Sequence, residues 1–424
     1  MTRYRQGWTT STTPKGAILN ATTLIRHLLP ILLLAAGPVL GEATGQWPAL
    51  SVRGFGTLGL AHNSNDQAGF IRDVTQPRGP KGDTRWDLDS RLGLQLDLDI
   101  GNNLSATVQG ISRYNHAGNF DPELAWGFVK FSPDDSLDLR AGRLGWDIYM
   151  LADSRDVGYS YLWARPPVEY YGPLQFSKIN GADLVLRHSL GNGVLWGKLF
   201  AGQATGKLSL DARNSVDVAG TDLAGGHINY ETGPWLARLG YTRLDLAVDI
   251  NGPVAPLMDL LAQFPEVFEA ISPEDTYHLY SVGLMFDEGP LQAQLMLGYQ
   301  KSEPPGVPDA NQGYVSVAYR MGQWTPFATA SFANALSSAL TPELPPGLPL
   351  PAGIGDSFSA NTTPDQTTLS LGARYDLWEN IALKVQYDHV NVRSDGRGYM
   401  LWREQDSGWD GRAGVFTATL DFVF

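Results

Sequence analysis

From about residue 50 onward, apolar and polar side chains alternate along the chain with a period of two. In the C-terminal segment GVFTATLDFVF (414–424), every second residue from Phe416 to Phe424 is apolar, and the residues between include Thr417 and Asp421. Residues 85–100 and 380–390 follow the same pattern. Because neighbouring side chains of a strand point to opposite faces, each segment predicts a strand with one apolar and one polar face.

The whole chain divides into sixteen such segments. We predict strands near 50–61, 84–100, 103–114, 123–132, 136–146, 180–189, 193–204, 222–232, 234–245, 275–287, 290–300, 312–321, 323–333, 366–378, 380–393 and 412–424. Turns of one to four residues, such as Gly191-Asn192 and Gly233, alternate with longer connections along the chain. The longer connections lie near 62–83, 115–122, 147–179, 205–221, 246–274, 301–311, 334–365 and 394–411.

This alternation of short and long connections is typical of an up-and-down barrel in an outer membrane, with short turns in the periplasm and long loops outside. In hydrocarbon every backbone polar group must be paired, so the sheet must close. We therefore predict an all-β fold, a closed antiparallel transmembrane β-barrel of about 16 strands. Eighteen strands are possible if one segment merges a pair, and a secreted soluble all-β protein is the alternative class.

The N-terminus has the pattern of an export signal. Four basic residues (Arg3, Arg5, Lys15 and Arg26) precede the apolar run LLPILLLAA (28–36), and small residues follow it. The run is too short to span a bilayer as a helix. We predict a signal peptide at 1–41 and one barrel domain at 42–424; a buried N-terminal helix is the alternative.

Composition excludes several classes of function. The 424 residues contain no Cys and carry a net charge of −13, which becomes −17 without residues 1–41. An acidic chain is a poor nucleic-acid binder, and without Cys there are no disulfides or thiol catalysis. The sequence has neither HExxH nor G-x-S-x-G, and its one adjacent acid–histidine pair, Asp388-His389, fits a hydrogen bond in the wall. We predict no enzymatic activity, no cofactor and no metal site.

Three features resemble the Gram-negative porins: the ending Leu420-Asp421-Phe422-Val423-Phe424, the opening strand from Val52 to Leu60, and sixteen strands with a long connection after the fifth. The resemblance implies a water-filled channel for passive diffusion of small polar solutes and ions, with Phe422 and Phe424 as the assembly signal. It also implies an integral outer-membrane homotrimer, partnered by membrane lipid and lipopolysaccharide and, during biogenesis, by the barrel assembly machinery.

In general porins the third loop folds into the barrel and its acids face a basic cluster. The matching connection here, about 147–179, is rich in Tyr, Trp and Pro, which predicts a folded loop. The candidate constriction residues are Asp153, Arg155, Asp156, Arg165, Glu169 and Lys178. The same composition would also suit a loop that covers the mouth or contacts a neighbouring subunit.

Alternation places further basic residues in the lumen, because a charge facing the bilayer midplane would cost about 2–4 kcal/mol. The predicted pore-lining residues are Arg85, Arg91, Arg113, Arg140, Arg187, Arg374 and Lys384. They would either create a transverse field that sorts solutes by charge, or pair in the wall with acids such as Asp87, Asp89, Asp97 and Asp183.

Two loops are unusual. Residues 253–271 have helical spacing of apolar side chains, which predicts a short amphipathic helix in an outer loop. Residues 341–353 (TPELPPGLPLPAG) are rich in proline, which favours extended structure. The alternatives to a general pore are a substrate-specific channel for sugars, organic acids or aromatic compounds and, less favoured, a barrel that acts as an adhesin or enzyme.

Overall fold

The computed structural model describes residues 49–174, 176–204, 206–209, 215–218, 220–247, 263, 276–303, 308–336, 364–393, 401–406 and 408–424. The predicted signal peptide at 1–41 and the Pro-rich loop at 341–353 lie outside these residues, as does all of the predicted helix at 253–271 except Gln263.

Sixteen long strands form the wall, each within a few residues of its predicted position apart from the second. They are β1 (Ala49–Asn63), β4 (Arg91–Gly101), β5 (Leu104–Arg113), β6 (Glu123–Asp134), β7 (Leu137–Gly145), β8 (Lys178–Leu190), β9 (Gly193–Ala204), β12 (Thr221–Thr232), β13 (Trp235–Asp245), β14 (Thr276–Glu288), β15 (Leu291–Glu303), β16 (Ala310–Tyr319), β17 (Trp324–Ala335), β18 (Asp365–Trp378), β19 (Ile381–Val392) and β21 (Arg412–Val423).

Several short elements lie in the connections. They are β2 (Gly69–Phe70), β3 (Thr84–Arg85), β10 (Lys207–Ser209), β11 (Ser215–Asp217), β20 (Trp402–Arg403), the 3₁₀ turn η1 (Gly158–Ser160) and the helical turn α2 (Val168–Tyr171). In the part of the chain that the structure describes, no helix is long and apolar enough to cross a membrane.

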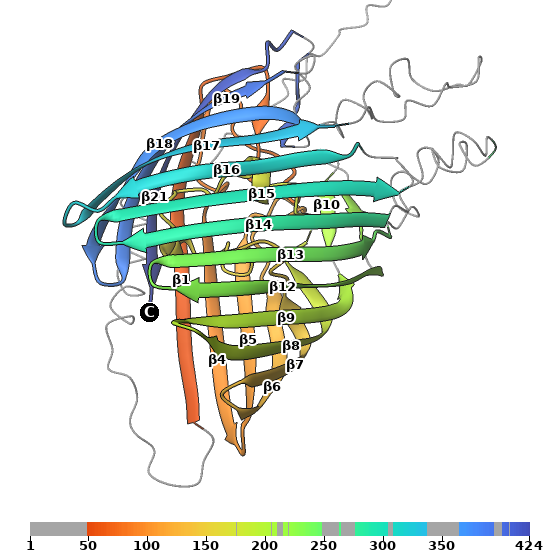
Figure 1. The fold of residues 1–424 in the computed structure, drawn as a ribbon. Helices are drawn as coiled ribbons and strands as arrows, with labels where there is room; N and C mark the ends of the chain where they lie inside the picture. The colour runs from red at the N-terminus through yellow and green to blue at the C-terminus, as the bar shows by residue number, and fades with distance from the viewer. Residues whose placement is uncertain are drawn as a thin grey trace, which may run out of the picture. The chain divides into compact units, whose positions relative to one another are not determined.

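Each wall strand pairs antiparallel with its neighbours, and β1 closes the sheet (Figure 1). The first part of β1 pairs with β4, with Ala49 opposite Asp99. Its later part pairs with β21, from Phe55 opposite Val423 to Asn63 opposite Val415. The sheet therefore has no free edge along β1, and the predicted closed barrel of sixteen strands is confirmed.

Exposure alternates along the strands as the sequence predicts. On β9, Leu199 is 63% exposed, whereas the neighbouring Lys198 and Phe200 are 4% and 5% exposed. On β4, Leu92, Leu94 and Leu96 are all exposed. An apolar surface that continues around a barrel is stable where it contacts lipid, so this is the outer face, and the buried partners point into the lumen.

The short turns owe their geometry to residues that tolerate positive φ. Gly191 and Gly233 have φ of 58° and 53° in the turns β8–β9 and β12–β13. No heavy atom lies within 4 Å of a Cβ built at either position. Glycine is therefore needed there for its backbone conformation and not for lack of space, as in tight hairpins generally.

The predicted strand at 84–100 is interrupted, which corrects the sequence interpretation. β3 ends at Arg85, and residues 86–90 form a turn before β4 begins. The Gly59 N–H donates to Ser90 Oγ (3.0 Å), so a side chain replaces a backbone acceptor here. Leu88 and Asp89 are both 2% exposed, so the alternation in this stretch does not correspond to two faces of a strand.

Candidate functional site

The connection between β7 and β8 runs from residue 146 to residue 177, and we call it the third loop. Lys178, predicted as a loop residue, is the first residue of β8, and its ammonium pairs with Glu123. The other five candidate residues of this loop, Asp153, Arg155, Asp156, Arg165 and Glu169, lie within it. Side chains on the inner face of several strands contact the loop, and these contacts define its course.

The second half of the third loop is bonded to β16, β17 and β18. Trp163 Nε1 donates to Thr329 Oγ1 (2.9 Å). Glu169 on α2 is fully buried and accepts hydrogen bonds from Ser331 Oγ (2.7 Å), Gln366 Nε2 (2.6 Å) and Thr368 Oγ1. Glu169 thus binds the loop to the wall through neutral donors.

A close approach fixes the loop against the β1–β21 seam. Lys384 Nζ donates to the Gly158 carbonyl (2.5 Å) and lies 3.1 Å from Asp421 Oδ2. A Cβ added to Gly158 would lie 2.0 Å from Asp421 Oδ1 and 2.4 Å from Thr57 Oγ1, so only glycine fits. Lys384 is therefore inward as predicted, but the loop covers it.

Arg374 also faces inward and holds the loop backbone. Its Nη1 donates to the carbonyls of Tyr159 (2.6 Å) and Tyr161 (3.0 Å), and its Nε donates to Asp376 Oδ1 (2.7 Å). Its guanidinium lies 4.6 Å from the centre of the Tyr159 ring. Arg374 therefore positions the loop where the sequence predicted a pore-lining charge.

A second deeply buried ion pair joins the third loop to the turn before β4. Arg165 Nη2 lies 2.5 Å from Asp89 Oδ2, and the two side chains are 1% and 0% exposed. Burial by itself would raise the pKa of Asp89, but the charges of Arg165 and Arg72 and the hydrogen bond from Arg165 outweigh it and lower that pKa. Asp89 therefore remains an anion at neutral pH.

Two predicted pore-lining arginines meet the acid of the loop. Arg113 Nη1 lies 3.3 Å and Arg91 Nη1 3.6 Å from Asp156 Oδ1. Burial alone would raise the pKa of Asp156, but the charges of Arg113 and Arg155 outweigh it and hold the pKa well below its usual range. The structure thus brings together a basic group on the second and third wall strands and an acid of the third loop.

The remaining predicted arginines form pairs within the wall or its connections. Arg140 lies 2.6 Å from Asp183, Arg187 2.7 Å from Asp138, and Arg85 2.5 Å from Asp87. The two sequence interpretations therefore divide the set: Arg91 and Arg113 face the loop, and these three pair with neighbouring acids.

The sequence interpretation missed a buried network at the start of the loop. Asp147 Oδ1 lies 2.6 Å from Lys198 Nζ, and Asp147 Oδ2 lies 3.0 Å from His227 Nε2. Arg238 donates to Asn229 Oδ1 (2.7 Å) and to the Asp147 carbonyl (3.3 Å). The alternation of apolar and polar residues could have predicted part of this network. Leu199 and Leu239 face outward, so the neighbouring Lys198 and Arg238 face inward.

One acid of the loop remains open to water. Asp153 is exposed, unlike Arg155 and Arg165. Lys198 and Arg238 act electrostatically on Asp153, and Asp153 acts on Arg140. Of these three basic groups, Lys198 and Arg238 are buried and Arg140 is partly exposed, so Asp153 and Arg140 are the members of this group that water reaches.

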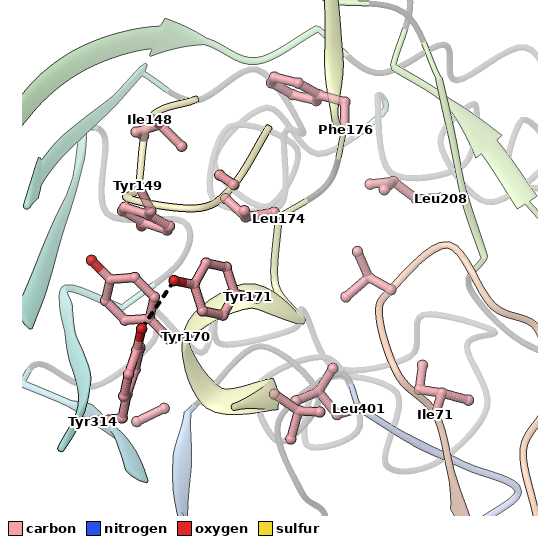
Figure 2. Close-up of a cluster of buried hydrophobic side chains, with 14 of the residues drawn as sticks. Ile71, Ile148, Tyr149, Tyr170, Tyr171, Leu174, Phe176, Leu208, Tyr314 and Leu401 are labelled. Carbon is pink, nitrogen blue, oxygen red and sulfur yellow. Dashed lines mark hydrogen bonds between the residues drawn. The ribbon is translucent and has the colours of Figure 1, made fainter. Parts of the chain in front are cut away.

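Aromatic and aliphatic side chains from several connections pack together in the same interior (Figure 2). Tyr149, Tyr170 and Tyr171 of the third loop meet Tyr314 of β16, and the Tyr171 and Tyr314 hydroxyls are 3.1 Å apart. Ile71 from the first long connection and Leu401 join the cluster. Aromatic packing thus joins the third loop to β16.

Three further sequence predictions concern the C-terminus and the acid–histidine pair. The Phe422 ring lies over Gly56, where an added Cβ would come within 2.4 Å of it, and Phe424 is 40% exposed. Asp388 is 4% exposed and points inward beside Gln386 (2.7 Å), whereas the next residue, His389, is exposed. Asp388 and His389 therefore do not act on one site.

A metal centre finds no support in the described residues, which contain no group of three or more His, Cys, Asp or Glu side chains able to hold an ion. The geometry instead is that of a barrel whose interior is crossed by a loop.

The family model described as Gram-negative porin matches residues 29–395. The chain belongs to the Gram-negative porin family. It is accordingly an integral protein of the outer membrane. No curated protein sequence matches this porin.

Solved structures share the fold at low identity. The Salmonella typhi OmpF complex with daunomycin has a TM-score of 0.56 at 11% identity over 88% of this chain and 97% of that one. An anion-selective porin from Comamonas acidovorans has 0.53 at 13% identity over 89% and 100%. In-vitro folded OmpT of Vibrio cholerae in its trimer form has 0.51 at 11% identity over 89% and 100%.

We predict that Arg165→Met destabilises the porin by about 3–5 kcal/mol at pH 7, because it leaves Asp89 buried without its closest counter-ion. The native carboxylate has a lowered pKa, so its stabilising effect is present above the ordinary Asp pKa of about 3.9 and is lost as pH falls through the native value. In the variant, burial favours protonation of Asp89. The free energies of unfolding of the wild type and of Arg165→Met are measured with urea in detergent micelles. The difference between them should therefore be smaller at pH 4 than at pH 7.

The matched control is Arg143→Met on β7, whose Nε donates to Asn180 Oδ1 at an exposed position. This substitution should change stability by less than about 1 kcal/mol. An equal cost for Arg165→Met at both pH values would contradict the assignment.

Proposed function

We propose that this porin is a water-filled channel for passive diffusion of small hydrophilic solutes and ions, and that it catalyses no reaction. The supporting observation is the accessible carboxylate of Asp153 on the third loop, which interacts electrostatically with the partly exposed Arg140 of the wall. Family membership supports a channel in general. The loop contacts β16–β19 and the β1–β21 seam, and its start contacts Lys198, His227 and Arg238. These contacts support a route along β6–β8, where the side chains of Arg140 and Arg187 are partly exposed.

In this proposal the third loop sieves by size, and charged groups sort by sign. The candidate constriction residue that water reaches is Asp153. Asp156 and its arginine partners, Arg91 and Arg113, form the adjoining charged group. Arg165, Glu169, Lys384 and Arg374 have a positioning role, because they are covered by the loop or bonded to it. Arg140 and Arg187 would line the route, with side chains 26% and 42% exposed.

A second candidate is a channel with a preference for aromatic or carboxylate solutes. A basic group lies over an aromatic ring on the proposed route, since Arg140 is 5.3 Å from the Phe128 centroid. Such a pair offers a cation beside a flat apolar face, which suits an aromatic acid. Block of the conductance by benzoate, and not by a sugar of similar size, would distinguish this candidate from a general pore.

The remaining proposals concern assembly. We propose a homotrimer, by analogy with the trimer form of Vibrio cholerae OmpT, embedded in lipid and lipopolysaccharide and inserted by the barrel assembly machinery, with Phe422 and Phe424 in its recognition signal. Cross-linking in native outer membranes should give a trimeric band. Folding that is unaffected by Phe424→Ala would contradict the proposed signal.

We predict that residues 1–41 are removed as an export signal, leaving a mature barrel domain at 42–424. The basic residues before Glu42 and the apolar run at 28–36 have the composition that signal peptidase substrates share. N-terminal sequencing of the protein extracted from outer membranes should begin near Glu42. An intact N-terminus in the membrane-inserted protein would refute the proposal.

The purified porin should produce stepwise increases in current when added to a planar lipid bilayer in 1 M KCl. A water-filled lumen conducts ions whenever a barrel inserts, so each insertion gives one step. The control is the same protein unfolded in urea and added without refolding. Inserted, folded barrels that leave the bilayer resistance unchanged would exclude the channel.

Asp153→Asn should shift ion selectivity toward anions. A unit charge about 4 Å from a permeating ion in water contributes about 1 kcal/mol, so the cation-to-anion permeability ratio should fall roughly two- to fivefold at low salt. The measurement is the reversal potential in a KCl gradient. Asp135→Asn, in an exposed turn between β6 and β7, is the matched control and should leave the potential unchanged. Equal potentials for Asp153→Asn and wild type would remove Asp153 from the route.

A further inference from the structure

Arg155 is a buried cation without a carboxylate partner. The residue is 6% exposed, and no carboxylate of the described residues lies within 4 Å of its guanidinium nitrogens. The neighbouring Asp156 carboxylate lies closer to Arg113 and Arg91 instead. Arg155 Nη2 is fully buried and has no hydrogen-bond partner within the described residues. Burial of a charge in this condition is costly, and arginine cannot relieve the cost by losing its proton.

Arg155 lines a small cavity where two connections meet. The cavity has a volume of about 20 Å³ and is bordered by Arg72 from the first long connection and by Arg155 and Arg165 from the third loop. Arg165 Nη1 is also fully buried without a hydrogen-bond partner, and its nearest acid, Asp388, is 3.6 Å away. Three guanidinium groups therefore border one space, and the buried Arg155 Nη2 has N–H groups to donate. Arg165 Nη1 lies toward Asp388, which borders a different cavity.

The two carboxylates of the lining are already engaged. Asp73 Oδ1 accepts from the Thr75 backbone N–H (3.0 Å) and from Thr75 Oγ1 (2.5 Å). Asp156 interacts with Arg113 and Arg91, as described above. Neither acid supplies the missing acceptor for Arg155 Nη2, so none of the described residues around the cavity satisfies this N–H group.

The size of the cavity restricts what that acceptor can be. A space of about 20 Å³ holds about one particle of the size of a water molecule. A monatomic anion is the anion nearest to that size. We propose that the cavity between Arg72, Arg155 and Arg165 is a binding site for a single halide ion, chloride under ordinary conditions, which holds the third loop to the first long connection.

This proposal does not depend on the channel function, because a resident ion would be required whether or not solutes pass. The test is crystallographic, with the full-length porin crystallised with sodium bromide in place of sodium chloride. Anomalous scattering at the bromine edge should show one peak in the cavity, within hydrogen-bond distance of Arg155 Nη2. Arg155→Gln should lose this peak, and Arg143→Gln, the control on β7, should keep it.

A second measurement does not need crystals. At equal ionic strength, the melting temperature of the wild type should be higher in sodium chloride than in sodium gluconate, by roughly 1–3 °C. Gluconate is too large for the cavity, and Arg155→Gln should abolish the difference. A wild-type map with no bromide peak in the cavity, where only water is bound, would overturn the proposal. So would a peak that persists in Arg155→Gln, or a chloride effect of equal size in both proteins.

Discussion

The pairing of β1 with both β4 and β21 is the interaction on which the rest of the structure depends. A sheet that lies in hydrocarbon cannot leave backbone N–H and C=O groups unpaired, so the first and last strands must meet. Closure then assigns each side chain to one of two environments, because strand neighbours point to opposite faces. Leu199 faces lipid and Lys198 the lumen for this reason alone. The near-neutral mean hydropathy of −0.17 follows, since apolar and polar positions cancel in the average.

Closure also confines the polar and ionic groups to an interior where burial of an unpaired charge is costly. The position of the third loop follows from the need to pair these groups. Each deeply buried charge described in the wall or the loop, apart from Arg155, has a partner across the lumen or on a neighbouring strand. Arg165 binds Asp89, Lys384 binds Asp421 and the Gly158 carbonyl, and Asp147 binds Lys198. Removing one member of such a pair leaves the other charge buried and unpaired. These contacts therefore fix one position of the loop, even where their net contribution to stability is small.

The sequence was sufficient to predict the strands and the inward orientation of Arg91, Arg113 and Arg140, because a period of two is local information. It was insufficient to predict which acid each base contacts. Asp89 and Arg165 are 76 residues apart, and the alternation pattern predicts a strand at 86–90, where the structure has the turn that makes their contact possible. Lys198 and Arg238 were within reach of the same reasoning, because exposed leucines adjoin both. The enclosed space beside Arg155 depends on two connections meeting, which no spacing along the chain reveals.

These contacts bear on how selectivity would arise in the proposed channel. The third loop is bonded to the wall at Trp163, Glu169 and Gly158 and packs through its tyrosines against Tyr314. A segment anchored at several buried points has few ways to move without breaking ion pairs or opening a packed core. Selectivity would therefore depend on fixed groups that water can reach, chiefly Asp153 and Arg140. On this argument, substitutions at buried loop contacts should alter stability before they alter selectivity, and substitutions at Asp153 should do the reverse.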